Sequence, residues 1–472
     1  MAPGVDGLAK LLISKHLRSH GGGSIAELAR GINRELAKAA GFGLLFARVG
    51  ASTGEDSGPD CSGGSAAGRS KRLRVRVLKF GGSSLAGGDQ IETAAARVSE
   101  ITRAGIQVIV VVSAMGGATD QLLALARRLH PEAPGEELDR LLATGESQVA
   151  ALMALALQQR GLAGRSFSGG EAGLVTDTCF GRARILDVNP SPIAASLAAG
   201  EIPVVAGFQG QTRDGRVTTL GRGGSDITAV ALGHAHHADR VVFFRHVEGV
   251  HSADPRMLSL SYRLERLDYD AMIDLAEAGA AILHPQSLEQ ARAYRLPLEV
   301  RGITSTSDST FIGDESAVNH LPVWMIVLSH PVAVLSVDSL PHDTGTMARL
   351  LHLIDRTDLC VDGCVQPTDS RTGLCLTLTL PDLEGPALHE QLSDFLREEP
   401  GLSFSIERRQ RRVTLVGRGV ASRRVQVAID HVAQRMGPPL SSFAGQRHRA
   451  FLVPDAEGRG WLASLHQELI KR

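Results

Sequence analysis

The sequence predicts an α/β protein: a mainly parallel sheet sandwiched by helices, followed by two smaller domains of β-α-β-β-α-β order. Residues 108–112 and 202–206 are apolar runs without alternation, and amphipathic helical stretches flank them, which is typical of strands covered on both faces. Glycine-rich loops follow these runs, where the carboxyl ends of parallel strands bind ligands. From about residue 330, the β-α-β-β-α-β order occurs twice.

Length and composition favour a globular protein of two or three domains. The chain has 472 residues, of which 43% are apolar. Its 50 Lys plus Arg balance 51 Asp plus Glu, so no global field attracts nucleic acid or anionic lipid. The chain has five cysteines, an odd number, which argues against a framework of disulfide bonds and indicates a reducing compartment. No apolar run approaches the about 18 residues of a membrane-spanning helix. We therefore expect a soluble cytoplasmic protein with no nucleic acid or membrane partner.

Residues 1–72 are predicted to be an N-terminal extension. Ser24 and Glu27 form a capping-box pattern before a helical apolar stripe. Residues 51–72 are small, polar and glycine-rich, which predicts a disordered linker. A transit peptide is one alternative, because residues 1–26 contain a single acid, Asp6. A flexible extension or an upstream start assigned in error is the other.

Residues 73–312 are predicted to form the larger domain. An apolar strand contains Lys79 near its end and opens into a glycine pair, Gly81 and Gly82, where bare backbone can approach phosphate. Further along, "LGRGGSD" at 220–226 precedes an apolar helix, so backbone N–H groups at the helix start face an anion.

Two interpretations of Asp226 are open at this point. It caps the helix, or it orients a lysine or a magnesium-bound phosphate, as phosphoryl transfer requires. Neither glycine loop matches the dinucleotide-binding or P-loop pattern.

Seven short motifs occur in one order along this domain. They are "KFGGSS" at 79–84, "VVSAMGGATDQL" at 111–122, "LLATGE" at 141–146, "AGFQG" at 206–210, "LGRGGSD" at 220–226, "SADPR" at 252–256 and "ILHP" at 282–285. In these motifs and in their order along the chain, the protein resembles the aspartate kinases of the amino acid kinase family. The resemblance implies a kinase that uses ATP and Mg²⁺ to phosphorylate L-aspartate to 4-phospho-L-aspartate, the first step toward lysine, threonine and methionine.

The resemblance also implies a role for each matched residue. Lys79 and Asp226 would be catalytic, with Lys79 against the transferred phosphoryl group and Asp226 holding the lysine. Glu146 would accept the α-ammonium of the substrate, although alone it reads as a helix-surface carboxylate. The implied substrate-binding residues are Ser113, Thr119, Glu146, Phe208, Arg222 and Ser225. The implied nucleotide-binding residues are Lys79, Gly81, Gly82, Ser83, Arg245, His246, His251, Asp254 and Arg256.

Four positions on the nucleotide side depart from the family pattern. Arg245 and His246 replace a usual Thr-Asp pair, His251 replaces Tyr, and Ala281 replaces Lys. One hypothesis is that Arg245 supplies the positive charge lost at Ala281. The alternatives are a domain that binds an amino acid but transfers phosphate poorly, acting as a sensor or regulatory subunit, and a kinase for another acidic amino acid.

Residues 330–407 and 408–472 resemble the paired ACT domains of aspartate kinases. The resemblance implies a homodimer or higher homo-oligomer that binds an end-product amino acid such as lysine or threonine. The effector loop "LPHDTG" at 340–345 has His342 and Thr344 where Asp and Pro are usual, so a role as dimer interface alone is the alternative.

No metal ligands are predicted from the cysteines or histidines. Cys360 and Cys364 lack partners at zinc-like spacing, so we interpret them as small buried side chains. His234, His236 and His237 lie near a predicted helix end, where they complement the helix dipole.

Overall fold

The computed structural model describes residues 74–470 apart from 132, 134, 281, 305–307, 315–320, 341–344, 347–348, 351–361, 368–373, 382–391, 396, 398, 400 and 445–446. The described chain divides into two compact units. The larger contains residues up to 327 with 415–425 and 466–470, and the smaller contains 328–414 and 426–465. The predictions for residues 1–72, for Ala281 and for most of the effector loop lie outside the described residues.

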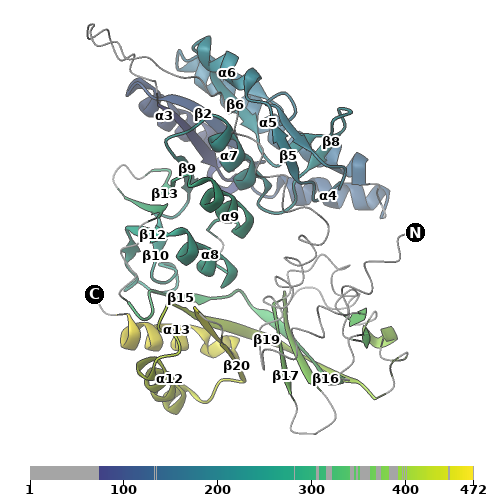
Figure 1. Ribbon diagram of the computed structural model, residues 1–472, viewed down its shortest axis with the longest axis vertical. Helices are drawn as coiled ribbons and strands as arrows, with labels where there is room; N and C mark the ends of the chain where they lie inside the picture. The colour runs from purple at the N-terminus through teal and green to yellow at the C-terminus, as the bar shows by residue number, and fades with distance from the viewer. Residues whose placement is uncertain are drawn as a thin grey trace, which may run out of the picture. The chain divides into compact units, whose positions relative to one another are not determined.

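An eight-stranded sheet forms the centre of the larger unit, in the order β12-β14-β13-β9-β1-β2-β6-β3 (Figure 1). All neighbours pair in parallel except β13 and β14. The strands are β1 (Val75–Phe80), β2 (Gln107–Val112), β3 (Gly164–Phe167), β6 (Ile202–Ala206), β9 (Val241–Arg245), β12 (Arg266–Asp268), β13 (Leu298–Gly302) and β14 (Ser309–Gly313). The predicted mainly parallel sheet is confirmed.

Helices cover both faces of this sheet, which explains why its central strands are mostly apolar and show no alternation. Neighbouring residues of β1, Val77 and Leu78, are both fully buried but belong to different hydrophobic cores. The core around Leu78 includes side chains of α3 (Gly88–Arg103) and α5 (Gly135–Gln159). The core around Val77 includes side chains of α6 (Ser191–Ala198), α7 (Gly224–Ala235), α8 (Tyr269–Glu277) and α9 (Pro285–Tyr294).

Short elements surround the carboxyl ends of the central strands. They are the 3-10 helix η2 (Gly82–Leu85), helix α4 (Ala118–Leu129), a four-stranded sheet of β4 (Leu174–Thr176), β5 (Ile185–Val188), β7 (Gln209–Gln211) and β8 (Val217–Thr219), and the pair β10 (Val250–His251) and β11 (Arg263–Leu264).

Helix α5 is the one described helix that is long and apolar enough to cross a membrane. Half of its apolar window is buried inside the protein, and it carries two buried carboxylates, Asp139 and Glu146. Ionisable side chains are rare in membrane-spanning helices, because placing a charge in the bilayer is costly. We therefore regard α5 as a core helix of the larger unit.

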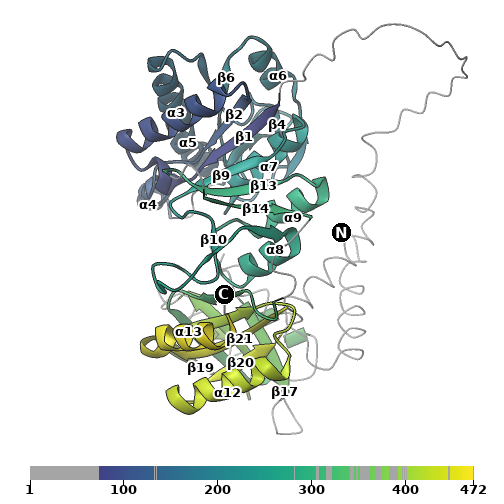
Figure 2. The same ribbon diagram turned by 90° about the vertical axis from the view of Figure 1, so that its left-hand side faces the viewer.

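The smaller unit is built on an antiparallel sheet in the order β17-β18-β16-β19-β21-β20. Its strands are β16 (Val332–Leu340), β17 (Asp362–Pro367), β18 (Leu374–Pro381), β19 (Ser403–Val416), β20 (Ser441–Ala444) and β21 (His448–Pro454), and β15 (Met325–Leu328) precedes them. Helices α12 (Arg423–Met436) and α13 (Asp455–Leu469) accompany β19 to β21 (Figure 2). The antiparallel sheet agrees with the predicted fold class, whereas the division into repeats at residue 407, which falls inside β19, stays a prediction.

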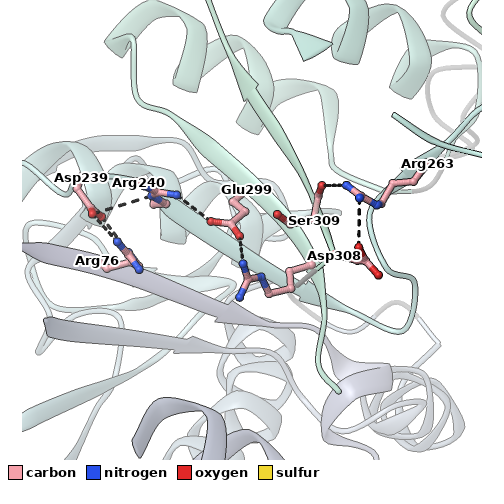
Figure 3. A network of polar contacts seen from close by, with 8 residues as sticks. Arg76, Asp239, Arg240, Arg263, Glu299, Asp308 and Ser309 are labelled. Carbon is pink, nitrogen blue, oxygen red and sulfur yellow. Dashed lines mark hydrogen bonds and ion pairs between the residues drawn. The ribbon is translucent and has the colours of Figure 1, made fainter. Parts of the chain in front are cut away.

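A network of charged side chains joins three strands near their amino ends (Figure 3). Arg76 of β1 donates to both carboxylate oxygens of Asp239, at 3.0 and 2.6 Å. Glu299 of β13 is 3% exposed and lies 3.1 Å from a guanidinium nitrogen of Arg240 and 2.7 Å from one of Arg301. Arg76, Asp239 and Arg240 lie at the opposite end of these strands from the glycine loops.

We predict that Glu299→Ala lowers the free energy of unfolding by about 2 to 3 kcal/mol, because two arginines then lose their buried partner. Arg240→Ala is the matched control and should cost only about 1 kcal/mol, since Glu299 keeps Arg301. Chemical unfolding followed by circular dichroism measures both. Equal losses in the two variants would contradict this account of the network.

Candidate active site

Two cations converge on one buried carboxylate at the carboxyl ends of β1 and β9. The Nζ atom of Lys79 lies 2.7 Å from Oδ1 of Asp226, and Nη2 of Arg245 lies 2.7 Å from Oδ2. The register places Phe80 beside Phe244, whose rings stack at 4.7 Å, so the ends of the two strands lie side by side. The structure therefore brings together three of the predicted residues.

Asp226 does not cap its helix. The residue before α7 is Gly223, in the left-handed region with φ of 72°, and no side chain caps the helix start. Asp226 lies in the first turn, and its side chain points to the two cations instead. Of the two interpretations drawn from the sequence, the capping one is wrong.

Burial and charge set the protonation of this cluster. Burial lowers the pKa of Lys79 to about 8, although the nearby Asp226 opposes the change. Burial alone would raise the pKa of Asp226, but the charges of Lys79 and Arg245 outweigh it and hold this pKa below its usual value. Asp226 is thus ionised at neutral pH.

Lys79 is also unusual in the composition of the chain. It is the only lysine between Lys71 and Lys471, whereas arginines are frequent throughout that stretch. A chain that otherwise uses arginine for positive charge keeps a compact ammonium at this one buried position.

The bare backbone of the glycine loop lies directly against the two cations. A Cβ atom on Gly81 would lie 3.3 Å from Nη1 of Arg245 and 3.8 Å from Nζ of Lys79. A Cβ on Gly82 would lie 2.7 Å from the carbonyl oxygen of Ala114, which is too close for any side chain. Ser83 is exposed at the start of η2. Bare backbone therefore lets an anion approach both cations.

Glu146 of α5 presents a second buried carboxylate. It is 4% exposed, so the interpretation as a helix-surface carboxylate is wrong. Its Oε1 accepts a hydrogen bond from the backbone N–H of Ala114 at 3.0 Å, while the buried Oε2 has no hydrogen-bond partner among the described residues. Burial raises the pKa of Glu146 to about 7, against the opposing charge of Lys79. One oxygen is therefore free to accept from a ligand.

The remaining predicted substrate residues lie on loops and first helical turns near the carboxyl ends of the strands. Ser113 follows β2 and Thr119 lies in the first turn of α4, both half-buried. Phe208 is half-buried and adopts φ of 67°, in the left-handed region that is unfavourable for an aromatic residue. Ser225 is buried in α7, and Arg222 is exposed before it.

The other predicted nucleotide residues lie on the segment that follows β9. His246 is exposed and His251 is half-buried, where burial lowers the pKa of His251. Asp254 and Arg256 form an ion pair at 2.7 Å. The hydrogen bond from Arg256 holds the pKa of Asp254 below its usual value.

Two residues of the site were not predicted. Asp139 is fully buried on α5 and accepts hydrogen bonds from the N–H and Oγ1 of Thr219, both at 2.7 Å, and from the N–H of Gly181 at 2.9 Å. The sequence did offer a clue to Asp139. It lies seven residues before Glu146, and two helical turns place both side chains on the same face of the helix. His284 lies against Gly223, since a Cβ there would fall 2.2 Å from Cγ of His284.

Comparisons with known proteins agree with this architecture. The model of the amino acid kinase family matches residues 74–302. Aspartokinase 2 of Bacillus subtilis is 38% identical over 349 residues, which cover 73% of this chain and 85% of the relative. The aspartokinase of Corynebacterium glutamicum is 37% identical over 361 residues, covering 74% and 85%. The resemblance that the seven motifs indicated is confirmed.

Solved structures show the same fold. Aspartokinase III of E. coli in complex with aspartate and ADP aligns with a TM-score of 0.69 at 23% identity, covering 84% of this chain and 100% of that chain. The same enzyme in complex with lysine and aspartate aligns with a TM-score of 0.68, at the same identity and coverage.

We predict that Gly82→Ala destabilises the larger unit by about 1 to 3 kcal/mol, because the new methyl group would press on backbone that cannot move aside alone. Gly88→Ala is the matched control: no atom lies within 4 Å of its added Cβ, and it begins α3. The control should leave stability unchanged or slightly higher. Thermal unfolding measures both, and equal behaviour would show that Gly82 is not held against Ala114.

Proposed function

We propose, because the chain belongs to the aspartokinases of the amino acid kinase family, that it transfers the γ-phosphoryl group of ATP to the side-chain carboxylate of L-aspartate. The observation that carries this proposal is the buried pair of Lys79 and Asp226 beside the bare Gly81, with the unpartnered oxygen of Glu146 on the neighbouring helix. This arrangement offers positive charge to a phosphate and a carboxylate to an ammonium group.

The transfer needs no nucleophile from the protein. One oxygen of the substrate's side-chain carboxylate forms a bond with the γ-phosphorus while the bond from that phosphorus to the β,γ-bridging oxygen breaks, which yields 4-phospho-L-aspartate and ADP. Lys79 neutralises negative charge on the transferred group, and Asp226 keeps the ammonium in place. Positioning and fixed charge supply most of the catalysis in such reactions.

Recognition of the substrate rests on its zwitterion. The free oxygen of Glu146 accepts from the α-ammonium, and Arg222 pairs with the α-carboxylate from its exposed position in the loop. The other residues assigned to the substrate are Ser113, Thr119, Phe208 and Ser225. Ser113 and Phe208 lie on the loops after β2 and β6, and Thr119 and Ser225 lie in the first turns of α4 and α7.

The nucleotide is assigned to the glycine loop and to the segment after β9. Gly81, Gly82 and Ser83 would approach the phosphates, and His246, His251, Asp254 and Arg256 would face the rest of ATP. Among the described residues no group of three or more His, Cys, Asp or Glu side chains gathers, and both oxygens of Asp226 already pair with cations. Mg²⁺ would therefore arrive bound to the phosphates of ATP, as is usual for this ion, and would neutralise part of their charge.

Several finer features follow from the family as proposals. We place the enzyme in the cytoplasm, at the first step toward lysine, threonine and methionine. The antiparallel sheet of the smaller unit would associate with that of a second copy, giving a homodimer or a higher homo-oligomer. An end-product amino acid such as lysine or threonine would regulate it through these ACT-like domains.

The central test of the proposal measures aspartate-dependent acyl phosphate. Purified protein with Mg²⁺, ATP and L-aspartate should yield aspartyl hydroxamate when hydroxylamine is present. The activity of Lys79→Ala should be at least about a thousandfold lower, since the cation that neutralises the transferred group is removed. Absence of product in the unmodified protein, with aspartate still raising its unfolding temperature, would favour the amino acid sensor instead.

The pH dependence should follow the two perturbed groups. Glu146 must be ionised to hold the α-ammonium, so kcat/KM for aspartate rises as pH increases through about 7, its pKa. Lys79 must be protonated, so the rate falls as pH increases beyond about 8. Glu146→Gln should lower kcat/KM and abolish the acid limb. An acid limb that persists unchanged in this variant would show that Glu146 does not bind the substrate ammonium.

A further inference from the structure

Arg245 occupies a position that the reaction as described so far does not use. It is the last residue of β9, and the pairing of Phe244 with Phe80 sets it beside the start of the glycine loop. Its Nη2 binds Asp226 at 2.7 Å, while Nη1 would lie 3.3 Å from a Cβ on Gly81. The same point lies 3.8 Å from Nζ of Lys79. Two cations therefore flank one bare glycine.

The guanidinium of Arg245 keeps free capacity toward a ligand. Its side chain is 19% exposed, compared with 5% for Lys79, so it reaches the open side of the cluster. Its Nη1 lies beside Gly81 and has no hydrogen-bond partner among the described residues. An arginine offers five N–H donors in a rigid fork, and Asp226 engages one end of it.

The charge balance of the cluster depends on Arg245. Lys79 and Asp226 together carry no net charge, so the pair alone offers little attraction to a phosphate group. Arg245 adds one positive charge that is already held in place by Asp226, and a fixed cation needs no reorganisation as negative charge develops.

We propose that Arg245 is a second catalytic cation, which binds the transferred phosphoryl group together with Lys79 across Gly81. The inference rests on the proposed phosphoryl transfer and deepens it. Nη1 of Arg245 donates to an oxygen of the γ-phosphoryl group, while Nη2 stays on Asp226. The guanidinium stabilises charge on these oxygens and takes no part in bond making or breaking.

Kinetics of three variants test this role. Arg245→Ala should lower kcat about a hundredfold to a thousandfold and leave KM for aspartate within about threefold. Arg245→Lys should recover only part of the loss, because an ammonium supplies the charge without the fork. Arg240→Ala is the matched control: it removes an arginine ion pair just before the same strand, at the opposite end, and should leave kcat unchanged. A kcat of Arg245→Ala within twofold of the unmodified protein would overturn the proposal.

Nucleotide binding gives a second readout that does not depend on turnover. Calorimetry with ATP and with ADP, each with Mg²⁺, measures the contribution of the γ-phosphoryl group. Arg245→Ala should reduce the preference for ATP over ADP by about tenfold to a hundredfold, with little change for ADP. A structural role alone would weaken both nucleotides alike, and that result would refute direct contact.

The two readouts also separate this inference from the function on which it rests. If the unmodified protein makes no aspartyl hydroxamate but its preference for ATP over ADP falls in Arg245→Ala, the phosphate contact stands and aspartate phosphorylation does not. If hydroxamate forms and the variant changes neither kcat nor the preference, the kinase stands and Arg245 is only an ion-pair partner of Asp226.

Discussion

The carboxylate of Asp226 ion-pairs with cations from two adjacent strands, and the geometry of the site depends on these contacts. Lys79 comes from β1 and Arg245 from β9, which are neighbours in the centre of the parallel sheet. The first turn of α7 delivers the carboxylate from the loop after β8. All three groups are buried or partly buried. If one of them moved away, it would leave an unpaired charge in the protein interior, which is unfavourable. These ion pairs thus hold the ends of two strands, the start of α7 and the glycine loop in place relative to one another.

Helix α5 organises the other side of the site. Its two buried carboxylates lie seven residues apart and do different work, since Asp139 holds the backbone of Thr219 and Gly181 whereas Glu146 keeps one oxygen free. Asp139 thereby ties α5 to the end of β8, directly before the loop that carries Arg222. The groups assigned to the α-ammonium and the α-carboxylate of the substrate are thus linked through a single helix.

The sequence allowed much of this fold to be predicted, because doubly buried strands have no alternation and the glycine loops mark their carboxyl ends. Lys79, Asp226 and Glu146 could be found from motif order, although a single motif left capping and surface interpretations open for two of them. The pairing of Arg245 with Asp226 could not, since it depends on how α7 packs against β9, which no local pattern reveals. Asp139 was missed for a similar reason: its partners are backbone groups 42 and 80 residues away, which no local pattern reveals.

The isolation of Lys79 in the sequence makes the site directly visible to spectroscopy. With no other lysine between Lys71 and Lys471, protein grown on lysine labelled at the side chain would carry one buried resonance in the whole described part of the chain. Its chemical shift would report the protonation of that ammonium and the occupancy of the neighbouring space. Within the described residues, the lysine of the site thus also serves as a built-in nuclear magnetic resonance probe.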